Sequence, residues 1–263
     1  MAIPVGVFGA GGRMGSLVCR TVAADPDLQL VAAIDPFHEG LDVGKVTGAT
    51  APGVRVSADA EALRFSKAQV AVDFTNIDAA RENLAWCAAN GVHAVVGTTG
   101  FGPDDYERLA TAFTSSNCFV APNFAIGAVL MMRFAELAAR YFETAEIIEL
   151  HHDQKADAPS GTAMLTAERV AAASSDWAPD PTKQTLLDGA RGGQASAGIR
   201  VHSVRLRGLV AHQEVLFGTT GQSLSIRHDS YDRSSFMPGV VLAVKKVARL
   251  SGLTVGLDAL IDV

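Results

Sequence analysis

Short apolar runs alternate with helical patterns through about the first 120 residues, and this alternation constrains the fold more than any other feature. The run Val70-Ala71-Val72-Asp73-Phe74 is nearly continuous in apolar side chains, as expected for a strand that is covered on both faces. Strands of this kind that alternate with helices form a parallel, doubly wound sheet. We expect strands over Ile3–Gly9, Leu28–Asp35, Val70–Thr75, Val92–Thr98 and Cys118–Pro122, and helices over Gly12–Ala24, Ile77–Asn90 and Pro103–Ser115.

The pattern changes after about Asn123, where longer strands with period-two alternation replace the buried runs. Leu224, Ile226 and His228 share one face of such a strand, which is typical of a sheet covered on one side. We therefore predict an α/β domain with a Rossmann-like doubly wound parallel sheet (residues 1–123 plus 230–263). A second, α+β domain (residues 124–229) would hold a mixed or antiparallel open sheet with helices. Its elements are helices over Ala125–Tyr141 and Gly161–Ala173, strands over Glu146–His151, Ile199–Gly208, Leu209–Thr219 and Gln222–Asp229, and a small-residue, mobile connection over 189–198.

Composition excludes several classes of function. Hydrophobic residues make up 48% of the chain and charged residues 19%, which is ordinary for a globular protein. A net charge of −6 without any basic run disfavours binding to nucleic acid or to an anionic membrane surface. The apolar run from Phe124 to Tyr141 contains Arg133, Glu136 and Arg140, so it predicts a packed helix rather than a membrane span.

Cysteine usage and the start of the chain indicate a cytoplasmic protein. Cys19, Cys87 and Cys118 are odd in number and lack C-x-x-C spacing, as expected for reduced and largely buried thiols. The segment Ile3–Phe8 already has the pattern of a first strand, which leaves no room for a signal peptide.

A glycine-rich loop, Gly9-Ala10-Gly11-Gly12-Arg13-Met14-Gly15, follows the first strand and opens a helix. Glycines there permit a tight turn and the close approach of a pyrophosphate, which then meets the positive end of the helix. Taken alone the loop is also compatible with a plain glycine turn. Asp35 strengthens the dinucleotide reading, because it ends the second strand about twenty residues later, where an acid binds the ribose 2′-hydroxyl of NAD.

Asp35 also bears on the choice of cofactor. A carboxylate at this point repels a 2′-phosphate, so NADH should be favoured over NADPH. Arg13, His38 or Lys45 could offset that repulsion, so use of NADPH stays open.

Two further segments lie at the carboxyl ends of predicted parallel strands, Gly97-Thr98-Thr99-Gly100 and Ala121-Pro122-Asn123-Phe124. Open α/β sheets bind ligands at that edge. Each segment could be an ordinary turn, but their shared placement favours contacts to the ribose and the nicotinamide.

The segment from His151 to Thr162 combines groups that can bind an anion and move a proton. Ser160 is placed to cap a helix whose first amides, at Gly161 and Thr162, could bind a carboxylate. His151 and His152 face opposite sides of a strand end, so one could meet the ligand while the other packs, and the pattern does not decide which. Lys155 follows within a turn's reach and disfavours the competing idea of a metal site, for which no third ligand has suitable spacing.

A capped helix and structural histidines are the plainer interpretation of the same residues. Arg233, just before the late helix predicted over Phe236–Ser251, is either a cofactor-cleft residue or a solvated arginine.

These motifs resemble the 4-hydroxy-tetrahydrodipicolinate reductase family of bacterial diaminopimelate and lysine synthesis. The resemblance covers essentially the whole chain and is most specific over Glu149–Thr162, while Leu209–Val215 is similar to actinobacterial members. It implies an oxidoreductase that reduces a small dicarboxylate, and a homotetramer formed through the second domain's sheet. One departure is Asp35-Pro36, where many members carry Glu-Arg, and this weakens the case for NADPH.

The resemblance also implies roles for individual residues. His151 and Lys155 would be the catalytic pair. The substrate would be held by His152, Lys155, Ser160, Gly161 and Thr162. The cofactor would contact residues 9–14, 97–99 and 121–124 together with Asp35 and Arg233.

The resulting hypothesis is NAD(P)H-dependent reduction of 4-hydroxy-2,3,4,5-tetrahydrodipicolinate to 2,3,4,5-tetrahydrodipicolinate. Hydride would go to ring C4, and His151 with Lys155 would donate the proton. The alternatives are another two-domain NAD(P)-dependent dehydrogenase of aspartate-derived metabolites, or a non-catalytic dinucleotide sensor. A semialdehyde dehydrogenase would need a catalytic cysteine, which Cys118 inside a strand disfavours.

Overall fold

In a computed structural model that describes residues 1–261, the chain divides into two compact units. The first unit comprises residues 1–124 and the C-terminal segment that begins at Phe236, and the second comprises residues 125–235. Residues 262 and 263, with which the predicted first domain ends, lie outside the described residues.

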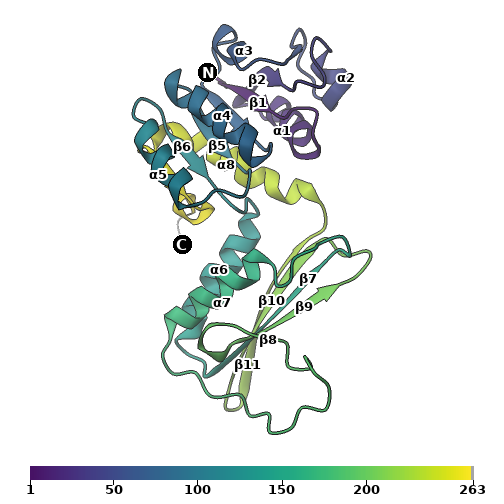
Figure 1. Cartoon of the computed structure of the whole chain (residues 1–263), viewed down its shortest axis with the longest axis vertical. Coiled ribbons are helices and arrows are strands. Elements are labelled where there is room, and N and C mark those ends of the chain that lie inside the picture. Colours follow the sequence, from purple (N-terminus) through teal and green to yellow (C-terminus); the bar gives the residue numbers. More distant parts are fainter. Residues whose placement is uncertain (262–263) are drawn as a thin grey trace. The chain divides into compact units, whose positions relative to one another are not determined.

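The first unit is built on a seven-stranded, wholly parallel sheet in the order β12-β6-β5-β4-β1-β2-β3. The chain runs outward in one direction from β1 to β2 and β3, and in the other direction from β4 to β5 and β6, so the order reverses between β1 and β4. Every residue of β4 is buried, as a strand covered on both faces requires. The predicted doubly wound sheet is therefore confirmed (Figure 1).

The elements of the first unit follow the predicted ones closely and add several short ones. Its strands are β1 (Ile3–Phe8), β2 (Leu28–Ile34), β3 (Val56–Ser57), β4 (Val70–Asp73), β5 (His93–Val96), β6 (Cys118–Val120) and β12 (Leu253–Val255). Its helices are α1 (Arg13–Ala24), α2 (Val43–Thr47), α3 (Glu61–Phe65), α4 (Ile77–Ala89), α5 (Pro103–Ala112) and α8 (Met237–Lys246), with 3₁₀ turns over Val247–Arg249 and Leu257–Leu260.

The second unit holds a five-stranded mixed sheet in the order β11-β10-β7-β9-β8, in which β7 and β9 are parallel and the other pairs antiparallel. Figure 1 shows α6 and α7 side by side along this sheet. The strands are β7 (Thr144–His151), β8 (Gly193–Gln194), β9 (Arg200–Arg205), β10 (Ala211–Thr219) and β11 (Gln222–Ser230). The helices are α6 (Ile126–Ala139) and α7 (Gly161–Ala173), with 3₁₀ turns over Ser196–Gly198 and Arg233–Phe236.

Strand β7 has two distinct faces. Ala145, Ile147 and Glu149 are buried, whereas Glu146 and Ile148 between them are only partly covered. Three buried residues of β10, Gln213, Val215 and Phe217, pair with the buried residues of β7, and the Gln213 side chain bonds to Thr166 on α7. The face that carries Glu149 therefore packs against the helices, and the alternate residues form an outer face.

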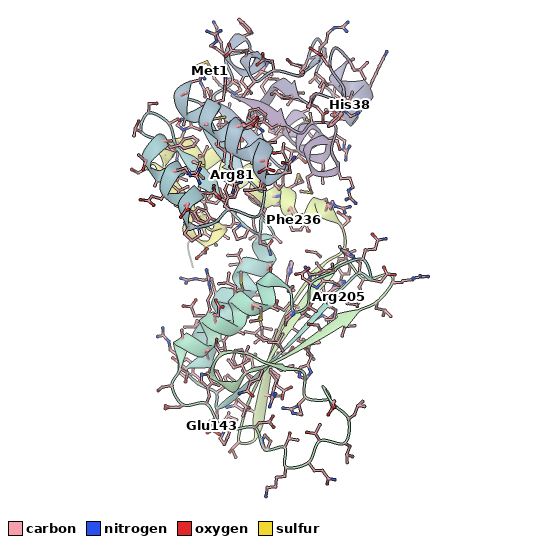
Figure 2. All side chains as sticks on the ribbon, viewed as in Figure 1. Met1, His38, Arg81, Glu143, Arg205 and Phe236 are labelled. Carbon is pink, nitrogen blue, oxygen red and sulfur yellow. The ribbon has the colours of Figure 1, made fainter. Side chains whose placement is uncertain are left out.

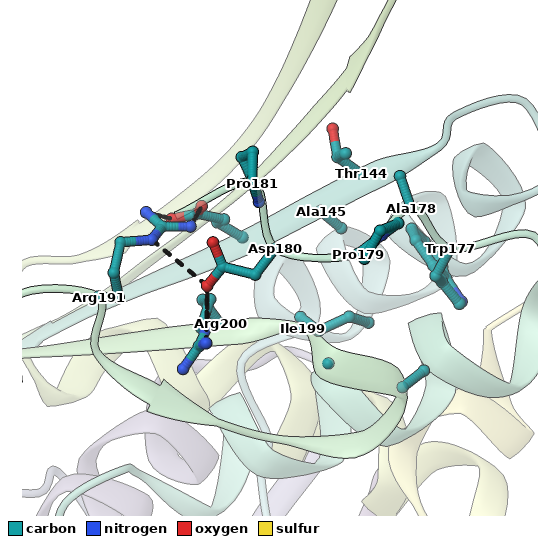
Figure 3. A pocket seen from close by; sticks show the side chains of 13 residues that line it. Thr144, Ala145, Trp177, Ala178, Pro179, Asp180, Pro181, Arg191, Ile199 and Arg200 are labelled. Atoms are coloured by element: carbon teal, nitrogen blue, oxygen red, sulfur yellow. Dashed lines mark hydrogen bonds and ion pairs between the residues drawn. The ribbon is translucent and has the colours of Figure 1, made fainter. Parts of the chain in front are cut away.

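The small-residue stretch 189–198, which the composition predicts to be mobile, is anchored to the sheet in this structure. It contains β8, paired with β9, and Arg191 bonds to the Glu146 carboxylate on β7. Asp180 lies between Arg191 and Arg200, with Arg200 donating to it at 3.0 and 2.6 Å (Figure 3). The cavity beside this cluster measures about 50 Å³, which is too small for more than a few waters.

Candidate active site

The glycine loop forms the tight turn that its sequence predicts. Gly9 adopts a φ of +66°, and the amide of Gly12 donates to its carbonyl oxygen over 2.9 Å. A side chain at Gly15 would place its Cβ 2.0 Å from that same oxygen, so the first turn of α1 packs directly on the loop. No side chain caps the start of α1, which suits the binding of a phosphate by the helix amides.

Asp35 fastens the end of β2 to this loop. Its Oδ2 accepts a hydrogen bond of 2.8 Å from the Gly11 amide, and its Oδ1 accepts from the Phe37 amide at 3.0 Å. His38 Nδ1 lies 3.0 Å from the same Oδ1, and Figure 2 labels this histidine on the first unit. Burial raises the pKa of Asp35, but the hydrogen bonds from His38, Gly11 and Phe37 outweigh it and leave the pKa lowered. Asp35 is therefore ionised at neutral pH.

A cleft of about 700 Å³ opens beside the loop. Its walls come from the carboxyl ends of β1, β2 and β4, at the point where the strand order reverses. Doubly wound sheets bind nucleotides at this position. The lining includes Gly9, Gly11, Gly12, Asp35 and His38, and adds Phe74, Thr75, Asn76 and Asn83, which the sequence analysis did not single out. Thr75 and Asn76 could have been recognised in the sequence, because they are polar residues just after the buried strand β4.

Phe74 connects this cleft to the two segments that follow β5 and β6. A Cβ at Gly97 would lie 1.9 Å from the Phe74 ring, so glycine makes room for that ring. The ring of Phe124 packs against Phe74 with centroids 5.6 Å apart. Thr98 donates a hydrogen bond of 2.7 Å to the buried Asp73 carboxylate. The same carboxylate also accepts hydrogen bonds from Thr75. The structure therefore brings the predicted segments 97–99 and 121–124 to the same sheet edge as the glycine loop.

The residues of this edge fit a dinucleotide. A Cβ at Gly11 would lie 2.3 Å from His38 Nδ1 and 2.9 Å from Asp35 Oδ2, so an alanine there would have to displace one of these side chains. Arg13 is exposed at the start of α1 and Met14 is half-buried beside it.

In the second unit, Ser160 caps α7 as predicted. Its Oγ accepts a hydrogen bond of 3.2 Å from the Ala163 amide, and the serine is buried. A Cβ added at Gly161 would meet no atom within 4 Å, so the space above the helix start is open. This combination of a capped start and open space suits an incoming carboxylate.

The charged residues before Ser160 are arranged in pairs. Lys155 Nζ donates to both oxygens of Asp157, at 2.7 and 2.8 Å. His152 is exposed just beyond the end of β7, and its carbonyl accepts from the Lys155 amide at 3.2 Å. His151 instead ends the strand with only 16% of its side chain exposed.

Sequence reasoning missed the partners of His151. Its Nδ1 bonds to the carboxylate of Glu149, which is completely buried on the same face of β7. Arg205 on β9, labelled in Figure 2, donates two hydrogen bonds to that carboxylate, of 2.9 and 2.8 Å. The Ser160 amide donates to it as well, at 3.3 Å. Glu149 lies within the motif, but Arg205 is 56 residues away, so the sequence gives little indication that these two side chains bond.

The pKa values of Glu149 and His151 are both lowered. Burial raises the pKa of Glu149, but hydrogen bonds from Arg205, Ser203 and His151 outweigh it, so the pKa is lowered and the carboxylate is ionised. The pKa of His151 is lowered chiefly by burial, against the opposing effect of Glu149, and Lys155 and Arg205 lower it further. The imidazole is therefore neutral at pH 7.

Arg233 is exposed in the 3₁₀ turn that ends the second unit. Within residues 1–261, no group of three His, Cys, Asp or Glu side chains is placed to hold a metal ion. Across that same range, every helix is too short or too polar to cross a membrane.

Comparison with known proteins identifies the family. Residues 3–124 match the family model described as dihydrodipicolinate reductase, N-terminus, and residues 127–261 match the corresponding C-terminus model. The chain belongs to the dihydrodipicolinate reductase family. Similar proteins named 4-hydroxy-tetrahydrodipicolinate reductase occur in Nocardia farcinica, with 50% identity over 100% of both chains, and in Mycolicibacterium smegmatis, with 50% identity over 98% of both chains.

Solved structures agree with this assignment. A structure described as dipicolinate-bound dihydrodipicolinate reductase from Paenisporosarcina sp. TG-14 is 41% identical, with a TM-score of 0.87 over 99% of this chain and 100% of that one. An amine dehydrogenase from Mycobacterium smegmatis is 17% identical over 97% of this chain and 95% of its own, with a TM-score of 0.65, and shares the fold alone. The expected family, its actinobacterial character, the fold class and the oxidoreductase activity are confirmed.

Proposed function

We propose that the protein reduces 4-hydroxy-2,3,4,5-tetrahydrodipicolinate to 2,3,4,5-tetrahydrodipicolinate, using NADH and, less well, NADPH. The observation that carries the proposal is the His151–Thr162 segment, where a neutral imidazole, an ammonium and an open helix start follow one another. The related structure from Paenisporosarcina was solved with dipicolinate, a cyclic dicarboxylate of the same kind as this substrate.

The first unit would bind the dinucleotide. The loop residues Gly9 to Met14 bind the pyrophosphate at the start of α1, and Asp35 faces the ribose. The buried, ionised Asp35 repels a 2′-phosphate, which supports a preference for NADH. Residues 97–99 and 121–124 contact the nicotinamide end, and we propose the same role for Arg233, which belongs to the second unit. When bound, the reduced nicotinamide supplies the hydride, which goes to ring C4 of the dehydrated substrate.

The second unit would bind the substrate. The helix start at Gly161 and Thr162, open at Gly161 and capped by Ser160, receives one carboxylate. Exposed His152 and partly buried Lys155 bind the ring's charged groups and fix its orientation. We also propose the predicted division of labour, with cofactor on residues 1–123 plus 230–263 and substrate on 124–229, although residues 230–235 belong to the second unit in the structure.

The proton would come from His151 and Lys155. Loss of water from C4 leaves a conjugated imine, and reduction at C4 leaves an enamine that takes a proton at the neighbouring ring carbon. His151 Nε2 is the ring nitrogen turned away from Glu149, since Nδ1 is engaged. General acid catalysis of this kind contributes roughly 10²–10⁴-fold to a rate.

We also propose that the protein works in the cytoplasm, in diaminopimelate and lysine synthesis, as a homotetramer assembled through the second unit's sheet. The outer face of that sheet leaves Ile148, Leu150 and Leu216 partly uncovered, which supports its use as an interface. Sedimentation of the purified protein tests the oligomeric state.

The experiment for the activity is steady-state oxidation of NADH, followed by absorbance, with substrate generated by a coupled synthase. We expect turnover that depends on the synthase product. Intact NADH binding without turnover would instead favour a dinucleotide sensor.

A further inference from the structure

The buried carboxylate of Glu149 is an unusual feature of the second unit. Its side chain has no exposed surface and is nevertheless ionised. It lies on the face of the sheet that packs against the helices. A buried charge is strongly destabilising unless it is fully paired. Arg205 supplies that pairing with both terminal guanidinium nitrogens, and Arg205 also donates to the Asp157 carbonyl at 2.7 Å.

The pairing determines how His151 is presented. An ionised carboxylate only accepts hydrogen bonds, so Nδ1 of His151 must carry the proton in its bond to Glu149. The neutral ring is thereby held with a free lone pair on Nε2. Parallel pairing of β7 with β9 places Arg205 directly beside His151, so both strands fix the geometry.

The charges around His151 cancel in two pairs. On the strands, Glu149 is paired with Arg205; in the loop after β7, Lys155 is paired with Asp157. Three charged groups act on the neutral imidazole, namely Glu149, Lys155 and Arg205. With Asp157, which is paired with Lys155, their charges sum to zero. A bound dicarboxylate adds two negative charges that nothing in this set balances.

We propose that Glu149 and Arg205 are positioning residues: Glu149 presents His151 through Nε2, and Arg205 offsets the charge of Glu149, so that the imidazole stays neutral until a dicarboxylate ligand arrives. This inference rests on the proposed function for the catalytic role of His151. The bound dicarboxylate then favours the imidazolium, which is the proton donor that the reduction needs. Without Glu149, the group that favours the imidazolium is lost. Without Arg205, the charge of Glu149 is no longer offset, so the imidazolium is favoured even when no ligand is bound.

The chain offers a matched control on the same strand. Glu146 lies on the outer face of β7 and is likewise bonded to an arginine, Arg191, and to a histidine, His202 Nε2, at 2.7 Å. Its replacement breaks a cluster of the same composition without touching His151. Glu146→Gln therefore reports what the loss of such a cluster does to stability alone.

The first measurement uses the unmodified protein. Nitrogen-15 histidine NMR should show His151 as the neutral Nδ1–H tautomer at pH 7, and as the imidazolium once dipicolinate is added. An imidazolium in the free protein, or a ring that stays neutral at saturating dipicolinate, overturns the inference. This readout needs no turnover, so it is independent of whether the proposed reaction occurs.

The second measurement is the pH profile of kcat/KM for three variants. Glu149→Gln should lower kcat by roughly tenfold or more. It should also lower the pH above which kcat/KM declines. Arg205→Met should raise that pH, and Glu146→Gln should leave it unchanged. If Glu149→Gln and Glu146→Gln behave alike, Glu149 is merely structural and the inference fails. Should the wild-type protein show no turnover, the proposed function fails while the NMR result stands by itself.

Discussion

The Gly11 amide donates a hydrogen bond of 2.8 Å to Oδ2 of Asp35, and this bond joins the glycine loop to the end of β2. Gly11→Ala should break the arrangement, because the new Cβ would lie 2.3 Å from His38 and 2.9 Å from Asp35. We expect the Kd for NADH to rise by about tenfold or more while the protein stays folded. Fluorescence titration with NADH measures the change. Gly193→Ala is the control, since its Cβ would meet only the Val201 carbonyl at 3.8 Å, and a similar loss of affinity in both variants would refute the assignment.

Asp35 and His38 should act on cofactor choice in opposite directions. Asp35→Asn removes the charge that repels a 2′-phosphate, so the NADPH/NADH ratio of kcat/KM should rise by about tenfold. His38→Ala removes a partly exposed imidazole beside that carboxylate and should lower the same ratio. Initial rates with both cofactors provide the test. Ratios that move in the same direction in both variants would contradict this account of the ribose site.

The three cysteines should be unreactive in the native protein. Burial raises the pKa of Cys19 to about 12 and raises those of Cys87 and Cys118 as well, so no thiolate forms at neutral pH. A thiol reagent such as Ellman's should label three groups only after denaturation. Fast labelling of the native protein with loss of activity would reopen the alternative of a cysteine-dependent semialdehyde dehydrogenase.

Acid should weaken a specific contact between α4 and α5. Hydrogen bonds from Arg81 to both oxygens of Asp105 lower the pKa of that carboxyl to about 2. Because the folded-state pKa lies below the ordinary value of 3.8, the stabilisation is present above about pH 4 and is lost as the pH falls through 2. Asp105→Asn should therefore lower Tm by a few degrees at pH 7 and by much less near pH 2. Asp104→Asn, at the exposed neighbouring position, serves as control, and a Tm difference that stays constant with pH would contradict the assignment.

Long, strongly patterned elements could be predicted from the sequence. Helix α7 begins and ends where the pattern places it, because Ser160 is an evident cap and the apolar spacing continues to Ala173. Strands β3 and β12 have two and three residues, which is too short for any periodicity to show. They form because the neighbouring strands β2 and β6 offer free edges.

The candidate site was predictable only where its residues are close in sequence. The glycine loop, Asp35 and the His151–Thr162 segment each carry a local pattern. The contact of Arg205 with Glu149 depends on the register of β7 against β9, which no local pattern specifies. The role of Phe74 likewise depends on Gly97 and Phe124 from other strand ends.

The most direct test of the proposed chemistry compares His151→Gln with the wild-type protein in two assays, turnover of the synthase-generated substrate and equilibrium binding of NADH. We predict that kcat falls by roughly 10²–10⁴-fold while the Kd for NADH is unchanged, because His151 donates a proton and belongs to the unit that would bind the substrate. Equal losses of turnover and binding, or turnover that survives the substitution, would contradict it.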